Sequence, residues 1–504
     1  MDARSVGSLD GAWLLSATEM RAAEARAIAA GTPGAVLMER AAASVVAAID
    51  AQWPELQPGA RICVLCGPGG NGGDGYAVAR MLAARGMRVA LHALAPASHP
   101  DAVGQATLWR EMGEIGGWDG ATNSAASADL VIDALFGIGL SRPLGAEIAA
   151  LREVRAPRRL AIDLPSGLCS ESGRVIGEAC LDADFTVTFH APKRGHVLAE
   201  GPARCGRLDL RDIGLDAVGG EIALTGVPAD LAKRAGHKYG YGHALVLSGE
   251  VGRGGAARMA ARAALRIGAG LVTLGCPAAA LQENAARLDA IMLRPVRDEE
   301  ALAGLLEDAR LNALLLGPGL GTGARERDLV AQALSAGRAT VLDADALTLV
   351  ANDDGLRGAL HPGCLLTPHE GEFARLCTDL ADRMTGPTTS GPAFSRLDAA
   401  REAAARLGCT LLLKGPDTVI AAPDGRARVN ASVYDRAAPW LATAGAGDVL
   451  AGIAAGLMAR GRDGFDAAST AAWLHSAAAR RFGPGLIAED LPEQLPGLLR
   501  ELGL

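Results

Sequence analysis

Aromatic residues are scarce: Phe, Trp and Tyr together make up 3% of the 504 residues. The hydrophobic fraction is nevertheless 49%, so the cores have to be built from Ala, Leu, Val and Ile, which suits helices packed closely on a parallel sheet. This composition excludes wholesale disorder. At roughly 100–200 residues per domain, the length predicts two to four domains.

The sequence also lacks an excess of positive charge, because its formal net charge is −8. A chain of this charge does not attract nucleic acid or an anionic membrane over long range, so we expect neither as a partner. An anionic ligand would have to be held by local features such as free backbone N–H groups.

Cysteine is thinly spread, and its number, nine, is odd. This pattern favours a reducing cytosol over a disulfide framework. Cys63 and Cys66 form a C-x-x-C motif inside an apolar run, and we interpret them as buried strand residues rather than a metal or redox site. The first 13 residues (MDARSVGSLDGAW) lack the apolar segment of a secretory signal. The low-charge run 441–458 contains Asp448 and several glycines, which favours a loop and a buried helix, so we predict a cytoplasmic protein.

Short apolar runs alternate with helical patterns through the first half of the chain. Ser16 and Glu19 are spaced as a capping box, and a second helical stretch covers about 34–50. The runs that predict strands are 61–66, 88–94, 130–135, 160–163 and 185–189. Strands that alternate with helices indicate βαβ units and a mostly parallel sheet, hence an α/β fold.

The pattern weakens over 214–232 and then starts again, which places the domain boundary in that stretch. The second set of predicted strands is 243–248, 271–276, 313–317, 339–343, 365–367, 410–414 and 419–422. This predicts a second, larger α/β domain. The segment 385–391 (TGPTTSG) is typical of a flexible loop.

A glycine-rich stretch, residues 66–75 (CGPGGNGGDG), follows a predicted strand and precedes a predicted helix over 76–85. Glycines let the backbone approach a ligand closely, and the free N–H groups at a helix start bind anions. The spacing matches neither the complete dinucleotide fingerprint nor the P-loop. We therefore predict a phosphate-type ligand held by neither common motif, with a tight packing turn as the alternative.

Further turns follow strands of the same predicted sheet, at residues 133–139 (DALFGIG), 163–167 (DLPSG) and 190–193 (HAPK). Ligands of open α/β sheets lie at the carboxyl ends of strands, so Asp133, Asp163 and Ser166 should converge with Asn71. Together they offer oxygen ligands for a hard cation and a carboxylate for proton transfer, although each Asp alone could be a turn residue.

Residues 11–220 resemble the nicotinamide-dinucleotide hydrate epimerase family. The resemblance rests on residues 31–39 (GTPGAVLME), 70–75, 133–139 and 163–167, in that order. It implies a Rossmann-like three-layer domain, placed at 1–222, that epimerises the R and S forms of hydrated NAD(P)H. One position departs from the family pattern, because Gly70 stands where the family usually has Asn.

The resemblance also implies roles for individual residues. Asn71, Asp133 and Ser166 would hold a potassium ion, and Asp163 would be the catalytic residue, with Lys193 a weaker candidate. The residues implied to contact the hydrate are Gly70, Asn71, Gly72, Gly73, Asp74, Gly137, Ile138, Gly139, Leu140, Ser141, Arg142, Pro143 and Asp163.

The strongest chemical motif of the second half is residues 441–452 (LATAGAGDVLAG), where a glycine turn leads into a predicted helix over 448–460. Open backbone N–H groups at such a turn can stabilise charge on a transferring phosphoryl group. Asp448 could be the base that takes a proton from a hydroxyl nucleophile, or a carboxylate that merely complements the helix dipole. Spacing alone leaves both interpretations open.

Other turns end predicted strands of the second half. They are 317–321 (GPGLG), 343–345 (DAD), 367–372 (TPHEGE) and 414–418 (KGPDT). The last could hold a nucleotide or be an ordinary Gly-Pro turn, and Asp343 and Asp345 could serve a metal or cap a helix. His369 is expected to be buried beside a helix terminus, which favours neutral imidazole.

Residues 237–480 resemble the hydrate dehydratase family, which has a ribokinase-like α/β fold. The motifs above occur in the order of the family, together with His237, Lys238 and Gly242, 254–256 (GGA) and 268–273 (GAGLVT). Ala446 departs from the pattern, since Ser or Thr is often found there. The resemblance implies a dehydratase domain over 223–504 that uses ADP, with magnesium as cofactor, and releases AMP and phosphate.

By this resemblance Ala256, Gly319, His369 and Asp448 contact the hydrate, with Asp448 as the candidate base. The AMP part of the donor would lie against Lys414, Gly415, Pro416, Asp417, Thr418 and Gly447. The implied reaction phosphorylates the C6 hydroxyl of the hydrate and then eliminates phosphate, because phosphate is a better leaving group than hydroxide.

The two resemblances are consistent with each other, since an epimerase converts the R hydrate into the S form that the dehydratase accepts. The expected partners are therefore the small molecules NADHX, NADPHX and ADP, and we expect a homo-oligomer. The main alternative is a ribokinase-like small-molecule kinase fused to a Rossmann-like binding module without catalysis.

Overall fold

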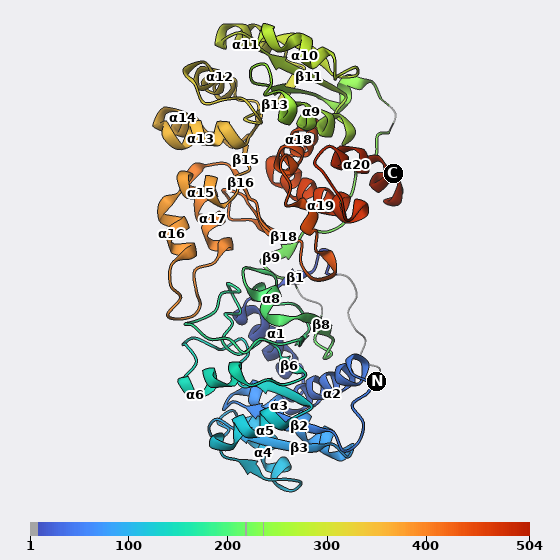
Figure 1. The fold of residues 1–504 in the computed structure, drawn as a ribbon, viewed down its shortest axis with the longest axis vertical. Helices are drawn as coiled ribbons and strands as arrows, with labels where there is room; N and C mark the ends of the chain where they lie inside the picture. Colours follow the sequence, from blue (N-terminus) through green and yellow to red (C-terminus); the bar gives the residue numbers. More distant parts are fainter. Residues whose placement is uncertain (1–8, 217–218, 235) are drawn as a thin grey trace. The chain divides into compact units, whose positions relative to one another are not determined.

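The computed structural model describes residues 9–216, 219–234 and 236–504 (Figure 1). Residues 1–8, part of the stretch in which no secretory signal is expected, lie outside the described residues. Residues 217–218, part of the expected domain boundary, also lie outside them. The chain divides into two compact units. The first consists of Met1–Ala223 and Gly386–Arg396, and the second of Leu224–Thr385 and Leu397–Leu504. A short segment from the second half of the chain therefore belongs to the first unit.

The first unit is built on a seven-stranded sheet in which all neighbouring strands are parallel, with the order β4-β3-β2-β5-β6-β7-β8. Its strands are β2 (Arg61–Cys66), β3 (Arg88–Ala93), β4 (Ile115–Gly116), β5 (Leu130–Ala134), β6 (Arg159–Ile162), β7 (Phe185–Phe189) and β8 (Arg207–Arg211). Outside this sheet, β1 (Trp13–Leu14) pairs antiparallel with β9 (Ile222–Leu224). The order of the strands reverses between β2 and β5, so the loops that follow these two strands open a crevice there.

Helices cover both faces of this sheet. They are α1 (Ala17–Ala29), α2 (Gly34–Gln52), α3 (Gly70–Ala84), α4 (Pro100–Arg110), α5 (Ala121–Ser127), α6 (Ala146–Ala149), α7 (Arg194–Val197) and α8 (Gly201–Cys205). Successive residues of β2 pack on opposite faces of the sheet. Val64 packs in one core with residues of α2 and α3, whereas Leu65 packs in another with residues of α5. The unit thus has three layers, as the sequence predicted.

The second unit contains a larger, mixed sheet, in which the strands of this unit follow the order β18-β17-β16-β15-β14-β13-β10-β11-β12. The strands are β10 (His243–Leu247), β11 (Leu271–Cys276), β12 (Met292–Pro295), β13 (Leu311–Leu316), β14 (Ala339–Leu342), β15 (Cys364–Leu366), β16 (Thr410–Leu413), β17 (Asp417–Ala421) and β18 (Ala427–Ala431). Neighbours from β16 to β12 are parallel, and β17 and β18 are antiparallel additions. The order reverses between β13 and β10.

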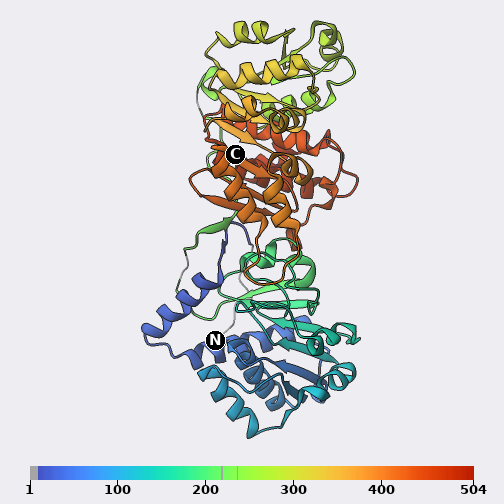
Figure 2. The same cartoon turned by 90° about the vertical axis from the view of Figure 1, so that its left-hand side faces the viewer.

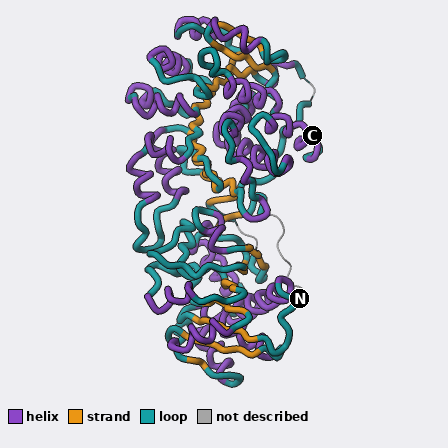
Figure 3. Tube along the Cα trace, viewed as in Figure 1, coloured by secondary structure: helices purple, strands orange, loops and turns teal. Residues whose placement is uncertain are grey.

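Two layers of helices cover this sheet, and Figure 3 shows them in purple on either side of the orange strands. One layer, α9 (Gly255–Arg266), α18 (Ala446–Ala459), α19 (Gly464–Phe482) and α20 (Asp490–Glu501), shares a single core with strand residues such as Val246 and Leu315. The other, which faces the viewer in Figure 2, contains α12 (Ala324–Ser335), α13 (Ala344–Asn352), α14 (Asp354–Gly358), α15 (Glu370–Leu376), α16 (Thr378–Thr385) and α17 (Arg396–Leu407). The short helices α10 (Leu281–Ala285) and α11 (Glu299–Leu306) complete the unit.

The α/β class with parallel sheets is confirmed, and so are most strands. The predicted bounds of β2, β7 and β11 coincide with the observed ones, and the capping box of Ser16 and Glu19 is present. Strands β8, β12 and β18 and the short strands β1, β4 and β9 were not predicted. The predicted helix over 76–85 is wrong at its start, because α3 begins at Gly70 and includes most of the glycine loop.

All nine cysteines are buried free thiols. Cys63 and Cys66 lie on β2, as predicted, and burial raises the pKa of the Cys63 thiol to about 12. No helix among the described residues combines the length and the apolar character needed to cross a membrane. The run 441–458 forms a turn followed by α18.

Candidate functional sites

The loops after β2 and β5 meet at the point where the strand order of the first unit reverses. A Cβ atom on Gly67 would lie 1.9 Å from the carbonyl oxygen of Leu135, and one on Gly72 would lie 1.8 Å from that of Gly67. Glycine is therefore required at both positions so that the two loops and the first turn of α3 can touch. The geometry at Gly72 therefore agrees with the alternative that the sequence left open, a tight packing turn.

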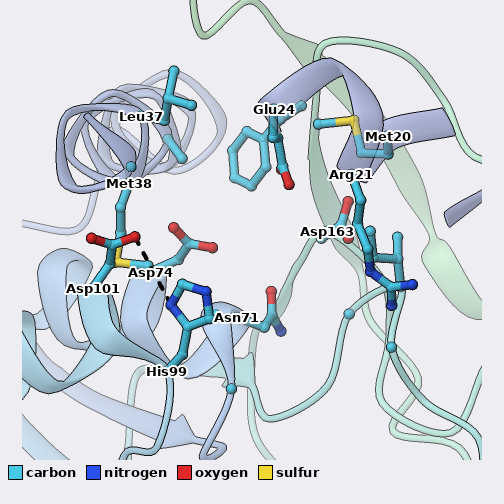
Figure 4. Close-up of a pocket in the computed structure, with 18 of the residues that line it drawn as sticks. Met20, Arg21, Glu24, Leu37, Met38, Asn71, Asp74, His99, Asp101 and Asp163 are labelled. Carbon is cyan, nitrogen blue, oxygen red and sulfur yellow. Dashed lines mark ion pairs between the residues drawn. The ribbon is translucent and has the colours of Figure 1, made fainter. Parts of the chain in front are cut away.

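A cavity of about 490 Å³ opens beside these loops (Figure 4). The predicted site residues that line it are Gly70, Asn71, Asp74, Gly137, Ile138, Gly139, Leu140 and Asp163. Lys193, the weaker catalytic candidate, lines it as well, whereas Gly72, Gly73, Ser141, Arg142 and Pro143 and the expected potassium ligands Asp133 and Ser166 do not. Gly73 is buried, and a Cβ atom there would lie 2.5 Å from Cε of Met38, so it also serves close packing.

Asp163 follows β6 and is buried in the cavity wall with a positive φ of 66°. Its Oδ1 accepts a hydrogen bond from Thr188 Oγ1 at 2.9 Å and lies 2.8 Å from Nζ of Lys193. Burial alone would raise the pKa of the Asp163 carboxyl, but the ammonium group of Lys193 lowers it overall. Nε2 of His196 lies 2.7 Å from the carbonyl oxygen of Asp163 and helps to hold this unusual backbone conformation.

Asp133 and Ser166 form a tight pair next to the cavity. Asp133 accepts hydrogen bonds from the backbone N–H and from Oγ of Ser166, both at 2.7 Å. Burial raises the pKa of Asp133 to about 6, although these hydrogen bonds oppose the shift. Asn71 lines the cavity on α3, and within the described part of the chain Nδ2 of its buried amide has no hydrogen-bond partner.

Four charged or titratable residues of α1 and of the start of α4 also line the cavity, and the sequence did not single them out as site residues. Arg21 and Glu24 project from α1, and His99 and Asp101 lie at the start of α4, where a dashed line in Figure 4 marks an ion pair of 3.9 Å between them. Helical spacing in α1 was visible in the sequence, but nothing local indicated which face of the helix meets the cavity.

The segment Gly386–Arg396 packs on the loop that follows β5. The backbone N–H of Gly391 donates to the carbonyl oxygen of Ser141 at 2.9 Å, and that of Gly177 donates to Thr388 at 2.7 Å. Ala393 is buried against Cys169 and Ile176. The loop predicted at 385–391 is present from Gly386 onwards, and backbone hydrogen bonds hold it on the first unit.

In the second unit, loops after several parallel strands converge near the start of α18. Lys414, after β16, places its Nζ 2.7 Å from Oδ1 of Asp343 and 3.7 Å from Oε2 of Glu372. A Cβ atom on Gly447 would lie 3.3 Å from Nζ of Lys414. Burial lowers the pKa of Lys414, but Asp343 and Glu372 raise it overall, so the ammonium ion persists.

Asp448 lies in the first turn of α18, beside the glycine turn. Burial, and then the negative charge of Asp343, raise the pKa of Asp448 to about 7, while Lys414 opposes the shift. A carboxyl group with a pKa near neutrality can both accept and release a proton. A carboxylate that only complements the helix dipole needs no raised pKa, so the environment of Asp448 favours the role of a base.

Ala256 and Gly319 come together where the strand order of the second unit reverses. A Cβ atom on Gly319, which has a φ of +64°, would lie 2.4 Å from the carbonyl oxygen of Arg253 and 3.8 Å from Cβ of Ala256. Glycine is needed here because the loop after β13 touches the loop after β10.

His369 and the 414–418 turn differ from the expectations. The side chain of His369 is 57% exposed, so its predicted burial is wrong. Its Nδ1 accepts the backbone N–H groups of Gly371 and Glu372 as the cap of α15, which requires an unprotonated nitrogen there. Asp417 and Thr418 are buried at the start of β17, so the turn itself is only Lys414, Gly415 and Pro416. Thr418 closes it by donating to the carbonyl oxygen of Gly415 at 2.7 Å.

Family models match both halves of the chain. Residues 244–495 match NAD(P)H-hydrate dehydratase, and residues 34–195 match the YjeF-related protein N-terminus. Among solved structures, an ADP/ATP-dependent NAD(P)H-hydrate dehydratase from Bacillus subtilis is 28% identical, with a TM-score of 0.43 over 54% of this chain and 93% of that one.

Curated relatives align over nearly the whole chain. A bifunctional NAD(P)H-hydrate repair enzyme from Moorella thermoacetica is 37% identical and covers 93% of both chains. One from Coxiella burnetii is 35% identical over 94% of this chain and 96% of its own length. These alignments span both units, so the alternative of a kinase fused to a non-catalytic module is not favoured. The chain therefore belongs to the family of bifunctional NAD(P)H-hydrate repair enzymes.

Proposed function

We propose that the cavity of the first unit epimerises hydrated NAD(P)H and that the cluster around Asp448 dehydrates the S form with ADP as phosphoryl donor. The observation that carries the first assignment is the buried pair of Asp163 and Lys193 in the cavity wall. Lys193 keeps Asp163 ionised, so the carboxylate can accept a proton at the reacting centre of the hydrate. We propose that the division of labour follows the expected boundary, with residues 1–222 for epimerisation and 223–504 for dehydration.

Potassium fits the oxygen atoms that lie at and beside the same cavity. Asn71, Asp133 and Ser166 offer carbonyl, carboxylate and hydroxyl oxygens, which are the ligands of hard cations. The amide of Asn71 has an orphaned polar atom, and rotation of the amide would present its oxygen there instead. A bound potassium ion would supply positive charge that orients the hydrate. Of the other expected contact residues, Gly70, Asp74 and Gly137 to Leu140 would shape the substrate site directly, and Gly72, Gly73 and Ser141 to Pro143 would support it from outside the cavity wall.

In the second unit, Asp448 takes the proton from the C6 hydroxyl of the hydrate. The hydroxyl oxygen then attacks the terminal phosphorus of ADP, AMP leaves, and the open N–H groups of the turn before α18 stabilise the charge of the transferring group. Loss of phosphate from C6 and of a proton from the adjacent ring carbon restores the reduced nicotinamide. Lys414 and Gly447 lie together beside this position, so the nucleotide would bind along residues 414–418. Ala256, Gly319 and His369 would contact the hydrate.

Magnesium fits the charge balance of this cluster. The carboxylates of Asp343, Glu372 and Asp345 all act on Asp448, against the single ammonium group of Lys414. A divalent cation that arrives with the diphosphate would offset this negative charge. No group of three or more His, Cys, Asp or Glu residues suited to a metal was found in the described ranges, so most of its ligands would be phosphate and water.

The test is the recovery of reduced-nicotinamide absorbance from a mixture of R and S hydrates, with ADP or with ATP and with magnesium and potassium present. Complete recovery with ADP supports both activities and the donor. Recovery that stops at the S fraction means that the first unit is inactive. No recovery with either donor would return the small-molecule kinase to consideration. Replacing potassium by sodium should slow epimerisation only, and light scattering would test the proposed homo-oligomer. The nine buried thiols fit a reducing compartment, and we propose the cytoplasm.

A further inference from the structure

Glu24 is an acidic residue of the cavity to which the assignments above give no role. It projects from α1, one helical turn after Met20 and Arg21, and all three line the cavity. In Figure 4 its carboxyl group points into the space between Asp74 and Asp163. The cavity thus presents carboxyl groups from α1, from α3 and from the end of β6.

The surroundings of Glu24 and Asp163 shift the pKa values of the two carboxyl groups in opposite directions. Burial, and then the negative charge of Asp163, raise the pKa of Glu24, while Lys193, Arg21 and His99 oppose the shift. Asp163 has a pKa below its usual value because of Lys193. Two carboxyl groups whose environments separate their pKa values in one cavity are suited to act as an acid and a base.

We propose that Glu24 is a second catalytic residue of the epimerase, the acid that works with Asp163 across the cavity. This inference rests on the proposed role of Asp163. The hydrate carries its C6 hydroxyl on a carbon bonded to the ring nitrogen, so inversion at C6 can proceed by loss and return of water. One group has to protonate the leaving hydroxyl, and another has to deprotonate the returning water.

Glu24 donates its proton to the hydroxyl oxygen, the C6–O bond breaks, and its electron pair leaves with water. The lone pair of the ring nitrogen forms a C=N bond, which makes C6 planar. Water adds to the opposite face, the C=N pair returns to nitrogen, and the carboxylate of Asp163 takes the released proton. Exchange with solvent restores both groups, and the opposite conversion uses the same steps in reverse.

Asp74 is the other carboxyl group near Glu24. It lies on α3, and burial together with the charges of Asp163 and Glu24 raises its pKa well above the usual value. A neutral Asp74 can donate a hydrogen bond to the substrate, which is consistent with its expected binding role. The titration of Glu24 therefore occurs among the cavity groups Asp74, Asp101, Asp163, Lys193, Arg21 and His99. Of these, Lys193, Arg21 and His99 favour its ionised form.

The test is Glu24→Gln, which keeps the size of the side chain and removes the proton. Conversion of purified R hydrate into S hydrate, followed without ADP, should slow by roughly 100-fold or more. Dehydration of the S hydrate with ADP reports that the second unit is intact, and an unchanged thermal unfolding curve reports that the first unit is folded. Glu55→Gln is the matched control, because Glu55 is exposed and lies outside the cavity. Unchanged epimerisation in Glu24→Gln would overturn the proposal.

Two further measurements separate an acid from a structural residue. The wild-type rate should fall at high pH as Glu24 loses its proton, and this decline should disappear in the Gln variant. Formate should partly restore Glu24→Ala, since a small acid can occupy the vacated space, and failure of this rescue in folded protein would overturn the proposal. Full epimerase activity of Asp163→Asn would contradict the proposed epimerase site itself. An inactive Asp163→Asn together with a normal Glu24→Gln would contradict only the role of Glu24.

Discussion

The ammonium group of Lys193 lies 2.8 Å from Oδ1 of Asp163, and only 1% of the lysine side chain is exposed. Thr188 connects the same two groups, because it accepts a hydrogen bond from Nζ of Lys193 at 2.8 Å and donates one to Asp163. Such a pair fixes the position of the carboxylate and its ionised state together. It also means that neither partner can be removed without leaving a buried charge.

We predict that Lys193→Met slows epimerisation by roughly 100-fold or more near neutral pH, because Asp163 loses the charge that keeps its pKa low. The pH–rate profile should move to higher pH, since the base then ionises later. Breaking a buried ion pair costs roughly 3–5 kcal/mol, so the melting temperature should fall. The double variant Lys193→Met with Asp163→Asn should recover part of that stability without activity. A single variant with an unshifted pH profile would contradict the role of Lys193.

Gly70 and Gly72 should respond oppositely to added side chains. A Cβ atom on Gly70 meets nothing within 4 Å, whereas one on Gly72 would lie 1.8 Å from the carbonyl oxygen of Gly67. Gly70→Asn should therefore fold normally, and its amide, which the family usually carries there, should lower KM for the hydrate. Gly72→Ala should lower stability by about 1–3 kcal/mol and reduce epimerisation. Thermal unfolding and epimerase kinetics of the two variants, with S-hydrate dehydration as reference, check this.

Much of the fold was accessible from the sequence because its strands are buried on both faces. β2 (RICVLC) is apolar after Arg61, β7 (FTVTF) consists of aromatic and β-branched residues, and the bounds of both were predicted correctly. The missed strand β8, with the sequence RLDLR, alternates charged and apolar residues at the edge of its sheet. Its short pattern of period two carried too few residues to stand out.

The sites were accessible only in part. Glycine turns at the carboxyl ends of parallel strands must share one edge of the sheet, so the convergence of Asn71 and Asp163 followed from topology. The start of α3 at Gly70 did not, because glycine has poor helix propensity and tertiary packing overrides it there. Glu24 reaches the cavity, and the segment Gly386–Arg396 reaches the first unit, through contacts between residues that are distant in sequence, and no local pattern encodes such contacts.

Gly391 offers a test of that distant segment. A Cβ atom on it would lie 2.8 Å from Cδ1 of Ile176 and 2.9 Å from the carbonyl oxygen of Leu140, which lines the cavity. We predict that Gly391→Val displaces this loop and raises KM for epimerisation by about tenfold, or about 1.4 kcal/mol. Dehydration should be unaffected.

Gly358→Ala is the matched control for Gly391, since a Cβ atom there meets nothing within 4 Å. A fragment of residues 1–223 lacks the segment, so it should epimerise more slowly than the complete chain. Equal kinetics of the fragment and the complete chain would show that the segment does not support the loop.

The pH dependence of dehydration should report the charges around Asp448. Because its pKa is raised to about 7 and the base must be ionised, kcat/KM should rise with pH through that value. Asp343→Asn removes a negative charge that raises this pKa, so the rise should move to lower pH. Lys414→Met removes a charge that lowers it, so the rise should move to higher pH while KM for ADP increases.

Asp343 and Lys414 lie 2.7 Å apart, yet their substitutions should shift the pH profile of kcat/KM in opposite directions. General damage to the site would lower the rate without shifting this profile, so the two variants distinguish it from an electrostatic effect on Asp448. Asp448→Asn should lower the dehydration rate by roughly 10²–10⁴-fold at every pH, because no other group replaces the base. Asp424→Asn, on the exposed turn between β17 and β18, is the control that should leave the profile in place. A wild-type profile that stays flat across the pKa of Asp448 would assign the proton transfer to another group and leave Asp448 as a substrate contact.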